Sequence, residues 1–298
     1  MLDSPRSGAL PTLCTCLALC IGLGGCAAGS AAFRGTDTSA SPSEPERHAV
    51  IQNTGSDTML NLALAWAEAY RDVAPDIDVA VTGGGTGTGV AGLLGGTVDM
   101  ANASRALKAE EFGNARRKGF TPIEHRVAVD ALAVIVHTDN PVGRLTIPQL
   151  ADIFTGRARN WAEFGGHDAP IVPVSRESNS GTHVYFLERV IRRGDGDNED
   201  IFAARTLLMP SSVGITSEVR RNPNAIGYDG LGYVSADSER ILAIAAAQGE
   251  SFVMPSVASA ADGSYPLSRP LFIDTTDEPT PAVAAYLAWI QSAEGQAI

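Results

Sequence analysis

Three short loops of this 298-residue chain combine glycine with hydroxyl side chains, each at a point where a helix is expected to begin. They lie at residues 54–58, 83–89 and 176–182. The first N–H groups of a helix have no partner within it, and the helix dipole favours negative charge there. Each loop could therefore bind an anion. The alternatives are a plain helix cap for the first loop and a mobile turn for the second.

The donors in these loops are backbone N–H groups, hydroxyls and one guanidinium. Glycines at 83–89 lack β-carbons, so their N–H groups can approach a ligand closely, and Thr86 and Thr88 add hydroxyls. In the third loop, Arg176 can bind a tetrahedral oxyanion through two parallel N–H groups. These groups suit capture of an anion rather than its chemical conversion.

Two other kinds of chemistry fit parts of the same loops. Residues 87–92 match the dinucleotide fingerprint G-x-G-x-x-G, which would make the protein an oxidoreductase, but the next expected strand leads into Ser104 rather than an acidic residue. Ser180 and His183 could serve a hydrolase as nucleophile and base, although the G-x-S-x-G elbow and a third partner are missing. The five histidines are scattered along the sequence, so no metal site is expected. No other cofactor is expected.

Alternation of short apolar runs with helical periodicity predicts an α/β fold in which each lobe is a mainly parallel sheet flanked by helices. The expected strands are 49–52, 77–81, 99–103, 127–137, 171–174 and 226–229, and the expected helices are 57–73, 90–95, 110–118, 148–154, 183–192, 211–221 and 281–296. The buried faces of two helices are expected to carry Leu60, Leu64, Ala67 and Val73 in the first and Val283, Tyr286, Leu287 and Ile290 in the last.

The N-terminus predicts export and a lipid anchor. An apolar stretch at 10–23 is too short to span a bilayer, and it ends in a Leu-Gly-Gly-Cys segment that resembles a bacterial lipobox. We expect a signal peptide at 1–25, lipidation of Cys26, and a flexible tether at 26–47 that is rich in small and polar residues. The protein would then lie in the periplasm or on the cell surface, anchored to the membrane.

Net charge restricts the partners. The 34 acidic residues outnumber the 22 basic ones, which gives a formal charge of −12. Nucleic-acid binding needs a basic surface, so a nucleic-acid partner is not expected. Any anion site must therefore be formed by a small group of neighbouring donors within an acidic protein.

The chain resembles the PstS family, the phosphate-binding subunits of bacterial Pst-type ABC importers. The resemblance covers nearly everything after residue 48, and the segments that carry it are 54–58, 83–89, 103–105, 153–156 with Asn160-Trp161, 176–182 and 225–228. It implies a two-lobed type II periplasmic-binding-protein fold, with residues 48–131 and 229–298 in the first lobe and residues 132–228 in the second. The lobes would close about the strands near Ala131 and Tyr228.

The resemblance also implies the ligand, the partner and the site. The ligand would be inorganic phosphate, another oxyanion being the alternative, and the partners would be a membrane permease and the lipid anchor, with the receptor itself a monomer. The implied phosphate-binding residues come from both lobes and are Ser56, Asp57, Thr58, Thr86, Ser104, Arg105, Arg176, Ser180, Gly181 and Thr182.

One departure from the family concerns the proton of bound phosphate. Some members place an aspartate after the Ala-Ser pair, where it accepts that proton, whereas this chain has Arg105. We expect Asp57 to take this role, because an ionised carboxylate only accepts hydrogen bonds and would repel fully ionised sulfate. The alternative is that Asp57 is a helix N-terminal acid distant from the ligand.

Overall fold

The computed structural model describes residues 49–298, in which nine strands form one large sheet. Eight follow the order β2-β1-β3-β11-β4-β8-β6-β7, and β9 pairs with β4. Their bounds are β1 Ala49–Gly55, β2 Ile77–Thr82, β3 Met100–Ala103, β4 Ile123–Val136, β6 Val172–Arg176, β7 Leu207–Met209, β8 Ala225–Gly230, β9 Arg240–Ile241 and β11 Ser268–Thr275. A second, small sheet pairs β5 (Arg144–Thr146) with β10 (Ala243–Ala245). The predicted signal peptide, Cys26 and the tether lie outside the described residues.

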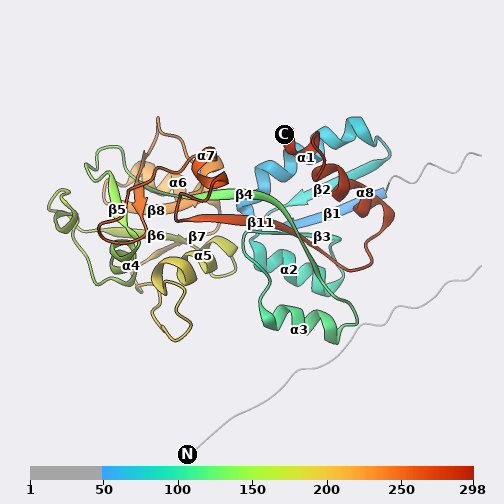
Figure 1. The fold of residues 1–298 in the computed structure, drawn as a ribbon, viewed down its shortest axis with the longest axis horizontal. Helices are drawn as coiled ribbons and strands as arrows, with labels where there is room; N and C mark the ends of the chain where they lie inside the picture. Colours follow the sequence, from blue (N-terminus) through green and yellow to red (C-terminus); the bar gives the residue numbers. More distant parts are fainter. Residues whose placement is uncertain (1–48) are drawn as a thin grey trace, which may run out of the picture. The chain divides into compact units, whose positions relative to one another are not determined.

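Helices cover both faces of the sheet (Figure 1). Their bounds are α1 Leu60–Val73, α2 Thr86–Gly95, α3 Ala109–Arg117, α4 Ile147–Thr155, α5 Gly181–Phe186, α6 Ser212–Arg221, α7 Val257–Ala261 and α8 Pro281–Ile290. A 3₁₀ turn at Asp57–Met59 precedes α1, and a π-helical segment at Leu187–Ile191 continues α5. In residues 49–298 we find no helix that combines the length and the apolar character needed to cross a membrane.

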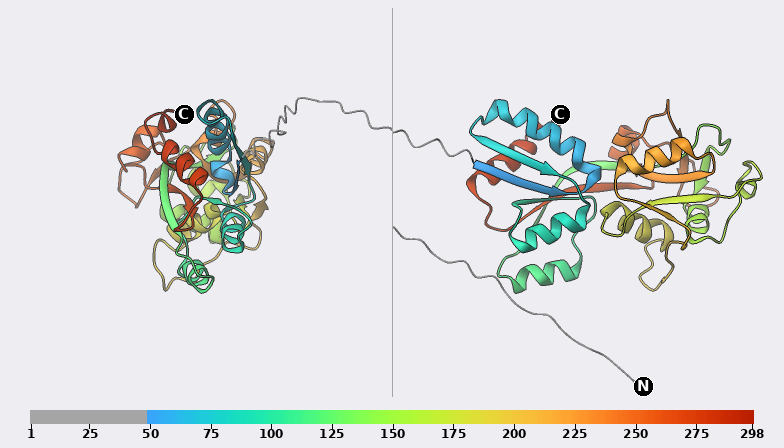
Figure 2. Two further views of the ribbon diagram at one scale, coloured as in Figure 1. Left: turned by 90° about the vertical axis from the view of Figure 1, so that its right-hand side faces the viewer. Right: turned by 180° about the vertical axis from the view of Figure 1, so that it is seen from behind.

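Strand β4 divides this architecture into two lobes. Its first part, up to Ala131, pairs antiparallel with β11, and its second part, Leu132 to Val136, pairs with β8. Residues 132–136 are fully buried, as expected for an apolar run covered on both faces. Figure 1, and the same ribbon seen from behind in Figure 2, show β1–β3 with α1–α3 at one end of this strand and β5–β8 with α4–α6 at the other. The predicted two-lobed α/β fold is confirmed.

Each lobe has its own apolar core. In the first lobe, Trp66 and Tyr70 of α1 pack with Tyr286 of α8 over Met100 of β3. In the second, the rings of Phe154, Phe186 and Tyr228 lie in contact, and Phe186 stacks on Tyr228 with ring centroids 3.7 Å apart.

The buried face of α8 matches the prediction, whereas that of α1 does not. Val283, Tyr286, Leu287 and Ile290 are buried in α8. In α1, Leu64 and Val73 are exposed, and Ala63, Trp66, Ala67 and Tyr70 are buried instead. Burial of the two aromatic rings removes more apolar area from water than burial of Leu64 and Val73 would, so it decides which face turns inward.

The lobe boundary after β8 differs from the one expected at residue 229. Residues 231–267 do not return to the first lobe, because β9 pairs with β4 near Val136 and β10 pairs with β5. Leu242, Ile244, Tyr265 and Leu267 then pack into the second core. The segment that leads the chain back to the first lobe is β11.

Candidate functional site

Glycines let the first two loops of the first lobe pack against each other. Gly55 ends β1 with a positive φ of 147°, and a β-carbon there would lie 2.2 Å from the carbonyl oxygen of Asn102. A β-carbon on Gly89 would lie 2.4 Å from the carbonyl oxygen of Thr54. Only glycine therefore fits at these positions, and the start of α2 lies directly against the end of β1.

Thr86 and Ser104 form the buried polar centre of the first lobe's side of the site. Helix α2 begins at Thr86, four residues before the expected start, so part of the glycine run is helical. The Thr86 hydroxyl accepts a hydrogen bond from the Ser104 N–H at 3.1 Å and lies 3.4 Å from the Ser104 hydroxyl. Both side chains are fully buried.

The second lobe presents Arg176 and the start of α5. Ser180 precedes α5, and its hydroxyl accepts a hydrogen bond from the Thr182 N–H. Arg176 is the last residue of β6 and only 1% exposed. Its guanidinium donates to the carbonyl oxygens of Met209 and Pro210 and to the Ser212 hydroxyl. These contacts fix the guanidinium at the edge of the lobe.

Direct polar contacts join the two lobes at these residues. Asp57 Oδ2 accepts from Arg176 Nη2 at 2.5 Å, and the hydroxyls of Thr58 and Thr182 lie 2.8 Å apart. Asn179 accepts from the Gly87 N–H at 2.9 Å and donates to the Gly84 carbonyl at 2.9 Å.

Gly181 allows a close approach of the two lobes. A β-carbon on it would lie 2.4 Å from Thr86 Oγ1 and 2.6 Å from Ser104 Oγ. Nine of the ten residues named from the sequence thus lie in or directly beside one interface, namely Ser56, Asp57, Thr58, Thr86, Ser104, Arg176, Ser180, Gly181 and Thr182.

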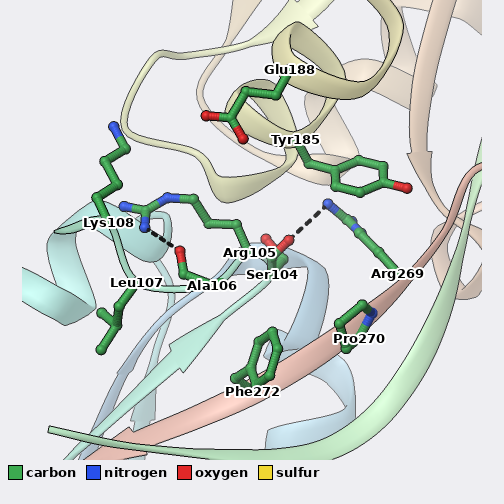
Figure 3. Close-up of a pocket in the computed structure, with 10 residues that line it drawn as sticks. All are labelled: Ser104, Arg105, Ala106, Leu107, Lys108, Tyr185, Glu188, Arg269, Pro270 and Phe272. Atoms are coloured by element: carbon green, nitrogen blue, oxygen red, sulfur yellow. Dashed lines mark hydrogen bonds between the residues drawn. The ribbon is translucent and has the colours of Figure 1, made fainter. Parts of the chain in front are cut away.

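Arg105 is the tenth residue, and its guanidinium is directed elsewhere. It forms a bidentate ion pair with Glu111 at 2.7 and 2.8 Å and donates to the carbonyl of Ala106. Figure 3 shows this side chain extending away from Arg269 toward Lys108. The ion pair explains the orientation, because Glu111 lies in the first turn of α3, three residues after Lys108. The binding of phosphate by Arg105 stays a prediction.

A different arginine, which sequence reasoning missed, lies at the site. The guanidinium of Arg269 donates to the Thr58 hydroxyl at 3.3 Å and to the Ser104 carbonyl at 3.2 Å, and it pairs with Asp130 at 2.9 Å. One signal was available, since Asp130 is the lone carboxylate of the apolar run 127–136 and buried charges need a partner.

A third buried carboxylate contributes to the electrostatics. Asp229 accepts from the Ser212 hydroxyl at 3.0 Å, and Ser212 in turn accepts from Arg176. Burial raises the pKa of Asp229 to about 6, and the positive charge of Arg176 opposes this rise. The Ser212 hydroxyl connects Asp229 to Arg176, whose positive charge favours the ionised carboxylate.

The geometry does not fit the two enzymatic alternatives. His183 Nδ1 lies 3.0 Å from Ser175 Oγ and 2.8 Å from the carbonyl of Arg176, whereas the Ser180 hydroxyl caps α5. At the dinucleotide fingerprint, the Gly87 N–H already donates to Asn179, so the second lobe covers the helix start where a pyrophosphate would bind. Within residues 49–298, we find no cluster of three side chains suited to a metal ion.

A cavity of about 410 Å³ lies beside the site at the edge of the lobe interface (Figure 3). Its walls are formed by Ser104, Arg105, Ala106, Leu107, Lys108, Tyr185, Glu188, Arg269, Pro270 and Phe272. Residues of both lobes therefore line it, and it reaches the buried site at Ser104 and Arg269.

Comparison with known proteins gives one consistent family. Residues 39–294 match the model of the PBP superfamily domain. The phosphate-binding protein PstS of Pseudomonas aeruginosa is 33% identical over 265 residues, which cover 83% of this chain and 80% of that protein. PstS of Bacillus subtilis is 31% identical, with 82% of this chain and 75% of that protein covered.

Two solved structures share the fold. A protein from Clostridium perfringens, described as a phosphate ABC transporter substrate-binding protein with bound phosphate, has a TM-score of 0.74 and 33% identity, with 83% of this chain and 95% of that chain covered. An ABC-type phosphate transport receptor from Vibrio cholerae has a TM-score of 0.65 and 29% identity, with coverage of 83% and 96%.

Proposed function

The chain belongs to the PBP superfamily and is PstS-like, and from this premise we propose that it captures inorganic phosphate between its two lobes for an ABC importer. The receptor would bind phosphate without a covalent step and would deliver it, as a monomer, to the membrane permease. The observation that carries the proposal is the meeting of Asp57, Thr58 and Thr86 of one lobe with Arg176 and Gly181 of the other.

The charges of the site support a ligand held mainly by hydrogen bonds. Two buried guanidiniums, those of Arg176 and Arg269, face three carboxylates of Asp57, Asp130 and Asp229. The cluster therefore has no excess positive charge, and N–H and O–H dipoles must hold the anion. Such dipoles act strongly in a buried site, where the local dielectric is low. This explains how a protein with a net charge of −12 could bind an anion.

Titration calorimetry with phosphate, arsenate, sulfate, molybdate and tungstate tests the proposed function. We expect phosphate to bind with a 1:1 stoichiometry and more tightly than sulfate. A protein that bound NAD or hydrolysed a chromogenic phosphoester, but did not bind phosphate, would refute the proposal and favour one of the enzymatic alternatives.

Asp57 is proposed to accept the proton of bound phosphate. Its Oδ2 faces Arg176 and its Oδ1 accepts from the Gly84 N–H at 3.3 Å, so the carboxylate lies at the lobe interface rather than on an outer surface. Protonated phosphate can donate a hydrogen bond to this carboxylate, whereas fully ionised sulfate cannot and would be repelled.

The Asp57→Asn variant is expected to bind phosphate about tenfold more weakly and sulfate more tightly than the wild type does, because the amide can donate to sulfate and carries no charge. Calorimetry with both anions measures the change in selectivity. Asp72→Asn, on an exposed part of α1, is a suitable control. If Asp57→Asn kept both affinities, the assignment of the proton acceptor would be wrong.

We also propose that the protein works outside the cytoplasm, anchored through a lipid on Cys26. This rests on the apolar stretch at 10–23 and the lipobox-like segment that ends at Cys26. A lipid attached there would keep the receptor near its permease.

Replacement of Cys26 by serine should move the protein from the membrane fraction to the aqueous fraction of the exporting cell, because the acyl acceptor is lost. Fractionation followed by immunoblotting measures the change, and phosphate binding should stay as in the wild type. Equal membrane retention of the wild type and the variant would exclude Cys26 as the anchor.

A further inference from the structure

Arg269 connects two of the proposed binding residues from a fully buried position. It lies in β11 with 2% of its surface exposed. Nη1 donates to the carbonyl oxygen of Ser104 at 3.2 Å, and Nη2 donates to the Thr58 hydroxyl at 3.3 Å. One guanidinium thus fixes the end of β3 and the turn before α1, which are separate in the sequence but adjacent at the site.

The same guanidinium is in contact with the second lobe. The ring of Tyr185 lies beside Arg269, with its centroid 5.4 Å from Arg269 Cζ (Figure 3). The Tyr185 hydroxyl donates to the carbonyl of Ser268 at 3.0 Å. Tyr185 belongs to α5, as does Thr182, whose hydroxyl lies 2.8 Å from that of Thr58. Arg269 therefore links the first lobe to the helix that carries Gly181 and Thr182.

Asp130 holds Arg269 at the point where the chain crosses between the lobes. The two residues face each other in the β4–β11 register, and Asp130 Oδ2 accepts from Nε at 3.1 Å and from Nη2 at 2.9 Å. Asp130 Oδ1 also accepts from the N–H of Leu231, the residue that follows β8. The ion pair thus joins β4 to β11 and also holds the residue that follows β8.

Stability alone does not account for this pair. The free energy lost when two charges are removed from water is about as large as the free energy gained from their attraction. Apolar side chains of similar volume often stabilise a protein as well or better. The positions of the remaining donors, which point to Thr58 and Ser104, suggest a role at the site.

We propose that Arg269, oriented by Asp130, is a positioning residue for anion binding. It fixes the Thr58 hydroxyl and the Ser104 segment in their binding positions and provides the contact on which α5 closes. It supplies the second guanidinium of the site, the place that the sequence suggested for Arg105. This inference rests on the proposed function and extends it to residues outside the three loops.

The paired variant Asp130→Asn/Arg269→Gln tests the proposal without leaving an uncompensated buried charge. We expect the dissociation constant for phosphate to rise at least tenfold, mainly through faster dissociation, because the closed state loses its positioning contacts. Titration calorimetry and stopped-flow release measure the two quantities. Arg126→Gln, an exposed arginine of β4, is the matched control and should bind as the wild type does.

A double-mutant cycle with Thr58→Val separates positioning from mere structural support. If Arg269 acts partly through the Thr58 hydroxyl, Thr58→Val should weaken binding less in the paired variant than in the wild type. Arg269→Lys keeps the charge but not the planar fork, so it should remain at least fivefold weaker than the wild type. If the paired variant does not fold, Arg269→Lys alone tests the positioning role of Arg269.

Three results would overturn the inference. They are a paired variant that binds phosphate within twofold of the wild type, full recovery of affinity by Arg269→Lys, and additive effects in the cycle. Failure of the wild type itself to bind phosphate would instead refute the proposed function.

Discussion

Replacement of Arg176 by alanine is expected to raise the phosphate dissociation constant by about 10- to 150-fold. One charge-assisted hydrogen bond contributes about 1.5–3 kcal/mol, and a factor of ten corresponds to about 1.4 kcal/mol. Arg176 is buried and held by Met209 and Pro210, so its guanidinium is already oriented when the ligand arrives. Loss of the side chain also leaves Asp57 without its partner, which adds repulsion of the anion.

Calorimetry at constant pH and salt measures the effect of Arg176→Ala, with Arg126→Ala on the exposed face of β4 as the control. The double variant Arg176→Ala/Asp57→Asn should recover part of the loss, because it removes the uncompensated carboxylate. Unchanged phosphate affinity in Arg176→Ala would contradict the assignment of this residue to the binding site.

A single methyl group on Gly181 should weaken phosphate binding about 100-fold while the protein stays folded. The added β-carbon would lie 2.4 Å from Thr86 Oγ1 and 2.6 Å from Ser104 Oγ, so the lobes could not approach to the distance seen here. The backbone of Gly181 is helical and alanine favours helices, so each lobe should keep its own stability.

Thermal unfolding and phosphate titration together check Gly181→Ala. Gly113→Ala in α3 is the matched control, because its β-carbon would meet only the end of the Arg117 side chain at 3.5 Å. The control should bind phosphate normally and unfold at a slightly higher temperature. If Gly181→Ala bound as tightly as the wild type, the close approach of Thr86 and Gly181 could not belong to the ligand-bound form.

The three candidate loops could be found in the sequence because their chemistry is local. A helix start with glycine and hydroxyl residues can be recognised within five to seven consecutive residues, as at residues 54–58 and 176–182. The ion pair of Arg105 with Glu111 could not be predicted from the sequence, because it depends on where α3 packs. Arg269 was missed because its contact with Asp130 arises from the pairing of β11 with β4, across 139 positions of the sequence.

The lobe boundary was less predictable than the strands themselves. β9 and β10 have only two and three residues, so no periodic pattern marks them. Their pairing with β4 and β5 keeps residues 231–267 in the second lobe. Long apolar elements such as β4 were evident, but the connections between them depend on contacts that are distant in sequence.

The contact between Asp57 and Arg176 gives the receptor an internal competitor. A ligand that carries a proton could accept from the guanidinium and donate to the carboxylate, whereas a fully ionised anion would have to compete with Asp57 for Arg176. The receptor should therefore choose among anions by their protons and shape rather than by charge alone.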